Sequence, residues 1–96
     1  MSWTKQAHRT PKKINDGDTF SLFKGINGSQ YVRLVGVDTP ERGERGYPNA
    51  KRYLQNLIAN KPVTIKPVAR DVYGRIVAEV YCNRQSVNKK IRQRGW

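Results

Sequence analysis

The apolar residues of this chain fall mostly in short runs separated by turn residues, and this pattern constrains its fold more than any other feature. Short runs rich in β-branched and aromatic residues, bounded by Gly, Pro, Asn or Asp, are typical of β-strands. Between the second and third runs, Asn27-Gly28 is a residue pair preferred in tight hairpin turns. The pattern predicts five strands, at residues 13–15, 19–23, 30–37, 63–68 and 75–81.

One longer segment has helical periodicity instead. Pro48 suits the first turn of a helix, because its missing N–H would have no partner there, and Asn60-Lys61-Pro62 ends the pattern. The apolar residues between these points recur at helical spacing, at Ala50, Tyr53, Leu54, Leu57 and Ile58. We therefore expect an amphipathic helix that packs one face on the core.

Near the C-terminus, Ser86 is a suitable N-cap for a short helix that buries Val87 and Ile91 and ends at Gly95. The predicted order is three strands, a helix, two strands and a helix. This order fits a mainly β fold with α-helices: a five-stranded Greek-key barrel of the OB type, with one helix between strands 3 and 4 and a short C-terminal helix. An α+β sheet with helices on one side is the alternative. The fold by itself assigns no function.

The sequence contains no internal repeat or linker, and we expect one domain at residues 13–96. Residues 1–12 are polar and basic and are expected to form a loose arm. The chain begins without the apolar segment of a secretory signal, and no apolar run approaches the ~18 residues of a membrane span. These features leave the localisation unknown.

The balance of charge points to a polyanionic partner. The chain has 19 Lys and Arg against 7 Asp and Glu, which gives a formal net charge of +12. Such an imbalance is typical of proteins that bind nucleic acid or an anionic membrane. Neither predicted helix combines a broad apolar face with aromatic anchors, so the membrane is disfavoured. The expected partner is nucleic acid, as single-stranded DNA, duplex DNA or RNA.

Five of the seven acidic residues are concentrated in two short segments, at Asp16, Asp18, Asp38, Glu41 and Glu44. The predicted hairpin brings Asp18, before one strand, near Asp38, after the next. Two adjacent carboxylates repel unless one is protonated or a cation lies between them. Oxygen ligands without nearby His or Cys favour Ca²⁺ or Mg²⁺ over zinc. An equally open interpretation is structural, with a turn at the first segment and a strand exit at the second.

Two arginines stand beside these acids in the sequence. Arg33 interrupts an otherwise apolar strand before Asp38, and Arg75 begins the last strand. A guanidinium group grips phosphate oxygens through two parallel hydrogen bonds, although either arginine is also compatible with a solvated surface position. Strict alternation along a strand places Arg33 and Asp38 on opposite faces, so a bulge or bend near Gly36 is needed to bring both to one site.

Taken together, three motifs resemble the staphylococcal nuclease family, which is also called thermonuclease-like. They are DGDT at residues 16–19, VRLVGVDTPE at 32–41 and DVYGR at 71–75, and the resemblance covers about residues 13–96. It implies an OB-type barrel and a calcium-dependent phosphodiester hydrolase, an endonuclease or exonuclease. Such an enzyme cleaves DNA and RNA without sequence specificity and leaves 3′-phosphate ends.

The resemblance also implies a metal site for Ca²⁺. Asp18 and Asp38 match the metal carboxylates, and Thr39 matches the ligand that offers its backbone carbonyl. Asp16 matches a nearby acid that supports the ligands without binding the metal itself.

The same comparison implies the residues that act on the substrate. Glu41 matches the residue that activates or orients the attacking water, and Arg33 and Arg75 match the pair that grips the phosphate. Tyr73 matches a substrate-binding tyrosine near the terminal phosphate.

The resemblance leaves two rival functions and one departure. A non-catalytic OB-type module that only binds nucleic acid is the main rival, and a basic RNA-packaging or ribosome-like protein explains the charge but not the clustered acids. Chains of the family usually continue past the Gly95-Trp96 position into a further helix, which we expect to be missing here. We expect a monomer, with an exposed Trp96 and its flank as the place where copies would associate.

Overall fold

The structure is a computed structural model that describes residues 2–96, and its helices and strands follow the predicted order closely. No helix among these residues is both long and apolar enough to cross a membrane. The elements are β1 (Ala7–Arg9), β2 (Pro11–Ile14), β3 (Thr19–Ile26), β4 (Ser29–Leu34), α1 (Tyr47–Ile58), β5 (Val63–Arg70), β6 (Ile76–Cys82), β7 (Gln85–Ser86) and α2 (Val87–Gln93).

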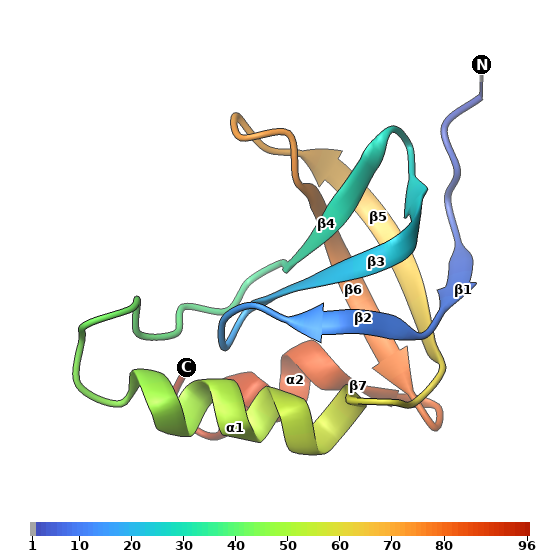
Figure 1. The fold of residues 1–96 in the computed structure, drawn as a ribbon. Helices are drawn as coiled ribbons and strands as arrows, with labels where there is room; N and C mark the ends of the chain where they lie inside the picture. The colour runs from blue at the N-terminus through green and yellow to red at the C-terminus, as the bar shows by residue number, and fades with distance from the viewer. Residues whose placement is uncertain (1) are drawn as a thin grey trace.

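The sheet curves into a nearly closed barrel because its two edges meet in one N-terminal segment (Figure 1). The strand order is β1-β5-β6-β4-β3-β2, with β7 added to β6. β1 pairs with β5 and β2 pairs with β3, and only Thr10 separates β1 from β2. β4 and β6 are parallel, and every other pair is antiparallel. This arrangement confirms the OB-type barrel.

The N-terminal segment corrects one expectation. Residues 1–12 were expected to be a loose arm, but β1 and the start of β2 lie within them. Ala7, Pro11 and Ile14 are buried, whereas their basic neighbours point outward. Pro11 fits because the register shifts between Pro11 and Lys13, where a missing N–H disturbs the ladder least. Because most residues of this segment are polar or basic, its few buried positions could not be recognised from composition.

The core lies between the barrel and the two helices, which cover its lower end in Figure 1. From α1, Ala50, Leu54 and Ile58 are buried, as the helical stripe predicts, and Tyr53 and Leu57 are partly buried. The fully buried side chains that meet them include Phe20, Leu22, Val32, Leu34, Ile65, Ile76 and Val80.

The predicted start of the last helix is confirmed. The Ser86 hydroxyl accepts a hydrogen bond from the Lys89 backbone N–H at 3.1 Å, and Val87 and Ile91 are buried. Trp96 was expected to be exposed, but it is half-buried and packs at a tilt against Tyr53, with 6.2 Å between ring centroids.

A fully buried Asn88 joins α2 to the barrel. Its side-chain amide donates to the backbone carbonyls of Val35 (2.9 Å) and Ala78 (3.1 Å). Its side-chain oxygen accepts from the Val80 N–H at 2.9 Å. One side chain therefore binds three backbone groups, in β6 and just after β4. Of these, the Ala78 carbonyl also accepts from the Val35 N–H at 2.9 Å.

We expect Asn88→Ala to lower the free energy of unfolding by about 3 kcal/mol, because three hydrogen bonds are lost and the Val35 carbonyl and the Val80 N–H lose their side-chain partner. Urea denaturation of the variant and the wild type measures this loss. Asn49→Ala, an exposed change on α1, is the control and should cost less than about 0.5 kcal/mol. Equal stability of the two variants would contradict the role given to Asn88.

Candidate functional site

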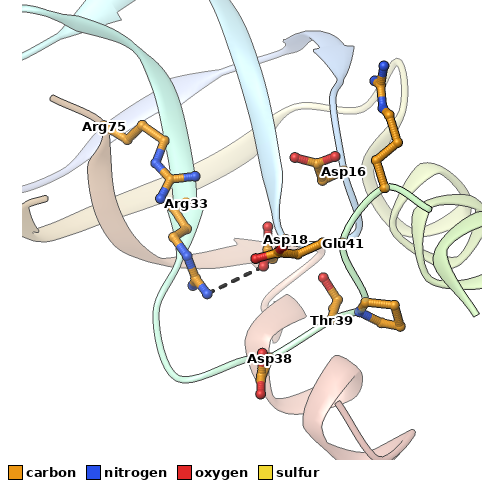
Figure 2. A pocket seen from close by; sticks show the side chains of 9 residues that line it. Asp16, Asp18, Arg33, Asp38, Thr39, Glu41 and Arg75 are labelled. Atoms are coloured by element: carbon orange, nitrogen blue, oxygen red, sulfur yellow. Dashed lines mark ion pairs between the residues drawn. The ribbon is translucent and has the colours of Figure 1, made fainter. Parts of the chain in front are cut away.

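A cavity of about 510 Å³ opens where β3 begins, β4 ends and β6 begins. Seven of the eight predicted site residues line it, and Figure 2 shows how they lie. The lining residues are Asp16, Asp18, Arg33, Asp38, Thr39, Pro40, Glu41, Arg42 and Arg75. The sequence therefore predicted most of this set, but it did not single out Arg42.

The β3–β4 hairpin places Asp18 beside Arg33. Thr19 pairs with Arg33 across the two strands, and the Leu34 N–H donates to the Asp18 carbonyl at 2.8 Å. The Arg33 Nη2 lies 3.4 Å from Asp18 Oδ2, and the Thr19 hydroxyl donates to Asp18 Oδ1 at 2.9 Å. Both oxygens of this carboxylate thus have partners within the protein.

The bend that the sequence required near Gly36 is present. β4 ends at Leu34 and not at residue 37, and Gly36 has a φ of +73°, which L-residues rarely adopt. Arg33 spans the bend: Nη1 donates to the Leu34 carbonyl at 2.6 Å and Nη2 to the Val37 carbonyl at 3.1 Å. This structural role of Arg33 was not apparent from the sequence.

The bend does not bring the Asp38 carboxylate to Asp18, as the sequence had suggested. Asp38 is exposed, and Figure 2 shows its side chain directed away from Asp18. Its backbone N–H donates to the Trp96 carbonyl at 3.2 Å. Within residues 2–96, no three His, Cys, Asp or Glu side chains are grouped closely enough to hold a metal ion. The turn at Gly36 changes the direction of the chain, and the Asp38 side chain that follows it points to solvent.

Thr39 and Glu41 point inward from the loop after this bend (Figure 2). The Thr39 hydroxyl is buried and has no hydrogen-bond partner among residues 2–96. The loop itself is held by Glu44, whose carboxylate accepts from the Glu41 N–H at 2.6 Å. Glu44 therefore shapes the loop and does not line the cavity, whereas the Glu41 side chain is exposed and lies toward Asp18.

The Asp16-Gly17-Asp18 segment is more than a turn. A Cβ on Gly17 would lie 2.8 Å from the Ala50 Cβ and 3.0 Å from the Thr39 hydroxyl, so only glycine lets α1 approach this closely. The Tyr47 hydroxyl, at the start of α1, lies 2.9 Å from Asp16 Oδ1 and holds that carboxylate at the edge of the cavity. The supporting role expected for Asp16 stays a prediction.

Arg75 is positioned by Asp71, a residue of the DVYGR motif to which the sequence assigned no role of its own. Arg75 Nε lies 2.7 Å from Asp71 Oδ2, and Asp71 Oδ1 accepts from the N–H groups of Tyr73 and Arg75, each at 2.9 Å. Burial raises the pKa of Asp71, but the hydrogen bonds from Arg75 and Tyr73 outweigh it and leave that pKa below its ordinary value. An acid four residues before an arginine, across a turn, is the signal that could have identified it.

This pairing occupies one edge of the Arg75 guanidinium. Among residues 2–96, the terminal nitrogens of Arg75 make no hydrogen bond, so they remain available to an anion. Tyr73 does not line the cavity; it is 80% exposed, and the Arg75 guanidinium lies 5.2 Å from the centre of its ring.

The fold and the cavity define an OB-type barrel with carboxylates and arginines at its rim. Residues 31–96 match the family described as Staphylococcal nuclease homologue, and the chain belongs to this family. An "Uncharacterized endonuclease" of Haemophilus influenzae is 34% identical over 83 residues, which cover 86% of this chain and 47% of that protein. The family assignment made from the three motifs is thus confirmed.

Two further relatives carry similar names. The "Probable endonuclease LCL3" of Komagataella phaffii is 41% identical over 75 residues, covering 71% of this chain and 33% of that protein. An "Uncharacterized endonuclease" of Escherichia coli is 32% identical over 74 residues, covering 77% of this chain and 48% of that protein. The chain spans about half the length of these relatives or less.

Asp71→Asn tests how Arg75 is held. The amide oxygen still accepts from the two N–H groups, but the charge opposite Arg75 Nε is lost. Because the pKa of Asp71 lies below its ordinary value of 3.8, its contribution to stability is complete above that value and disappears as the pH falls through the folded pKa. We expect Asp71→Asn to be less stable near neutral pH by under about 1 kcal/mol, since the pair is partly exposed.

The difference should shrink as the pH falls through the folded pKa of Asp71, because the wild-type carboxylate then becomes neutral as well. Urea denaturation of both proteins across this pH range measures it. Glu79→Gln, which neutralises a carboxylate outside the cavity, is the matched control. A difference between Asp71→Asn and the wild type that does not change with pH would contradict the assignment.

Proposed function

We propose that the chain is a Ca²⁺-dependent nuclease that hydrolyses phosphodiester bonds of DNA and RNA without sequence specificity and leaves 3′-phosphate ends. The observation that carries this proposal is one cavity that combines Asp18, Glu41 and Arg75 in a strongly basic chain. Membership of the staphylococcal nuclease family and the endonuclease names of its relatives support a nuclease-like function.

The charge of the cavity supports a bound cation. Its four carboxylates outnumber its three guanidinium groups, so the lining carries a formal charge of −1 within a chain of +12. A phosphodiester would be repelled by such a lining unless a cation were added. The donors are all oxygens, which suits Ca²⁺.

The residues present fit this ion. Asp18 and Asp38 would hold it through their carboxylates and Thr39 through its backbone carbonyl. The buried Thr39 hydroxyl, which has no partner within residues 2–96, is a further oxygen at this place. In residues 2–96 no ion pair or hydrogen bond fixes the Asp38 carboxylate away from the cavity. When bound, Ca²⁺ would supply positive charge that polarises a phosphate oxygen.

Glu41 is the proposed base. Its carboxylate is exposed and lies on the cavity side of its loop, where it can accept a proton from a water molecule or orient that water for in-line attack. The Glu44 carboxylate on the Glu41 N–H fixes the loop, so that the position of Glu41 does not depend on the substrate.

Arg75 is the proposed phosphate grip. Asp71 holds its Nε edge, and its terminal nitrogens can donate two parallel bonds to phosphate oxygens. The negative charge on these oxygens grows toward the transition state, so donors fixed in advance stabilise that state selectively. Arg33 would add its charge from the β4 side.

Asp18→Asn should weaken Ca²⁺ binding by at least about tenfold, because a carboxylate ligand loses its charge. Isothermal titration of Ca²⁺ into the wild type and the variant measures this affinity. Glu79→Gln is the matched control and should bind Ca²⁺ as the wild type does. Unchanged affinity in Asp18→Asn would remove Asp18 from the metal site.

Glu41→Gln separates catalysis from binding. The wild type should cleave labelled single-stranded DNA, duplex DNA and RNA with Ca²⁺ but not with a calcium chelator. Glu41→Gln keeps the size of the side chain but cannot accept the proton, so cleavage should fall by roughly 10²–10⁴-fold. Its affinities for Ca²⁺ and for oligonucleotide should stay within about twofold of the wild type, because Glu41 is neither a ligand nor a phosphate contact in the proposal.

Two outcomes would change the proposal in different ways. If the wild type binds oligonucleotides but shows no calcium-stimulated cleavage, the non-catalytic OB module takes the place of the enzyme. If the wild type cleaves and Glu41→Gln is fully active, the nuclease stands and only its base is reassigned.

A further inference from the structure

Two aromatic side chains are exposed on the outer face of the barrel, beside the cavity. Phe23 on β3 is 72% exposed and Tyr31 on β4 is 49% exposed. Phe20 and Val32 pair across the same two strands and are completely buried, so the alternating positions on these strands point outward. Neither aromatic contributes to the core, and neither belongs to the three motifs that identify the family.

Tyr31 has a cavity-lining arginine near it in two directions, along its own strand and across the sheet. Along β4 it lies two residues from Arg33, on the same face. Across the sheet, Val32 pairs with Ile76 in parallel register, so the preceding residues, Tyr31 and Arg75, are also neighbours. Tyr31 therefore lies on the same face of β4 as Arg33, which lines the cavity where the proposed function puts the reacting phosphate.

Two lysines of β2, Lys12 and Lys13, lie on the same side of the sheet as the rings. The Lys12 ammonium lies 5.7 Å from the centre of the Phe23 ring. Lys13 pairs with Ser21, and Ser21 pairs with Tyr31, so these side chains form one row across β2, β3 and β4. Phe23, Tyr31, Lys12 and Lys13 thus form an aromatic–basic strip that runs outward from the cavity (Figure 1 shows the three strands).

We infer that the aromatic–basic strip binds single-stranded nucleic acid that leaves the cavity, with bases stacked on Tyr31 and Phe23 and phosphates close to Lys12 and Lys13. Alternating cations and exposed rings suit this ligand, since each nucleotide offers an anion and a flat π-surface. A duplex offers the anions only, because its bases are already stacked. The strip therefore favours single strands over duplexes.

The charge of the strip decides against a second copy of this chain as its occupant. A chain of +12 would bring further positive charge to Lys12 and Lys13, whereas a polyanion neutralises them. This inference deepens the proposed function, because it names the form of the substrate, but its test needs binding alone.

The test compares single-stranded and duplex DNA of equal length by fluorescence anisotropy, with a calcium chelator present so that nothing is cleaved. Replacing both rings, as Phe23→Leu/Tyr31→Leu, keeps much of the apolar area and removes the stacking surfaces. Single-strand affinity should fall by at least about fivefold for each ring, while duplex affinity changes by less than about twofold. Val68→Ala, which trims an exposed apolar residue on β5, is the control and should change neither.

The salt dependence distinguishes stacking from charge. Lys12→Gln/Lys13→Gln should lower the slope of log affinity against log salt by roughly 0.7 for each lost single-strand contact, whereas the double leucine variant should leave that slope unchanged. Lys51→Gln/Lys89→Gln removes the same charge from the two helices and controls for the net charge. It should change the slope by less than half as much.

Equal losses for single strands and duplexes in the double leucine variant would overturn the inference. So would unchanged affinity together with a shift from dimer to monomer in sedimentation, which would make the strip a self-association surface. If the wild type never cleaves nucleic acid, but the double leucine variant still loses single-strand affinity relative to it, the strip is upheld and only the proposed nuclease is overturned. Circular dichroism melts establish that each variant is folded, as the exposure of both rings leads us to expect.

Discussion

The bend between β4 and the loop at residues 38–42 is the constraint on which the candidate site depends. Three backbone carbonyls in it are held by two side chains: Arg33 donates to those of Leu34 and Val37, and Asn88 donates to that of Val35. A carbonyl that leaves a sheet needs another donor, because an unpaired buried one costs as much as a lost hydrogen bond. Since the two side chains come from β4 and α2, the loop carrying Thr39 and Glu41 is fixed to both.

Most of the fold could be predicted because its signals are local. The Asn27-Gly28 turn, with both residues at positive φ, and the Ser86 cap each act within a few residues, and the stripe on α1 follows from helical periodicity. Of the two N-terminal strands, β1 was not predicted, and β2 was predicted only in part, at residues 13–15. β1 and β2 have few apolar residues and exist because two distant strand edges need partners, which is a property of the closed barrel.

The candidate site shows the same division between local and distant causes. Strand ends that meet in the barrel explain why Asp18, Arg33 and Arg75 share one cavity, and the alternation along β4 correctly required a bend at Gly36. The direction of the Asp38 side chain depends on how that bend is built, which the spacing of residues does not encode. The hydrogen bonds of Arg33 to the bend were missed for the same reason.

Arg33 and Arg75, which the sequence suggests as a phosphate-binding pair, have different partners within the protein. They therefore have different roles in the proposed function. Arg75 is paired through Nε alone, so its terminal nitrogens can meet a growing charge without reorganisation. Arg33 uses both terminal nitrogens within the protein, and its Nη2 also faces Asp18 at 3.4 Å. In the proposed function, a cation bound by Asp18 would take the place of Arg33 Nη2 at this carboxylate and would leave that nitrogen available to a phosphate. We therefore propose that Asp18 would couple metal binding to phosphate binding, because the same oxygen would serve either the arginine or the ion.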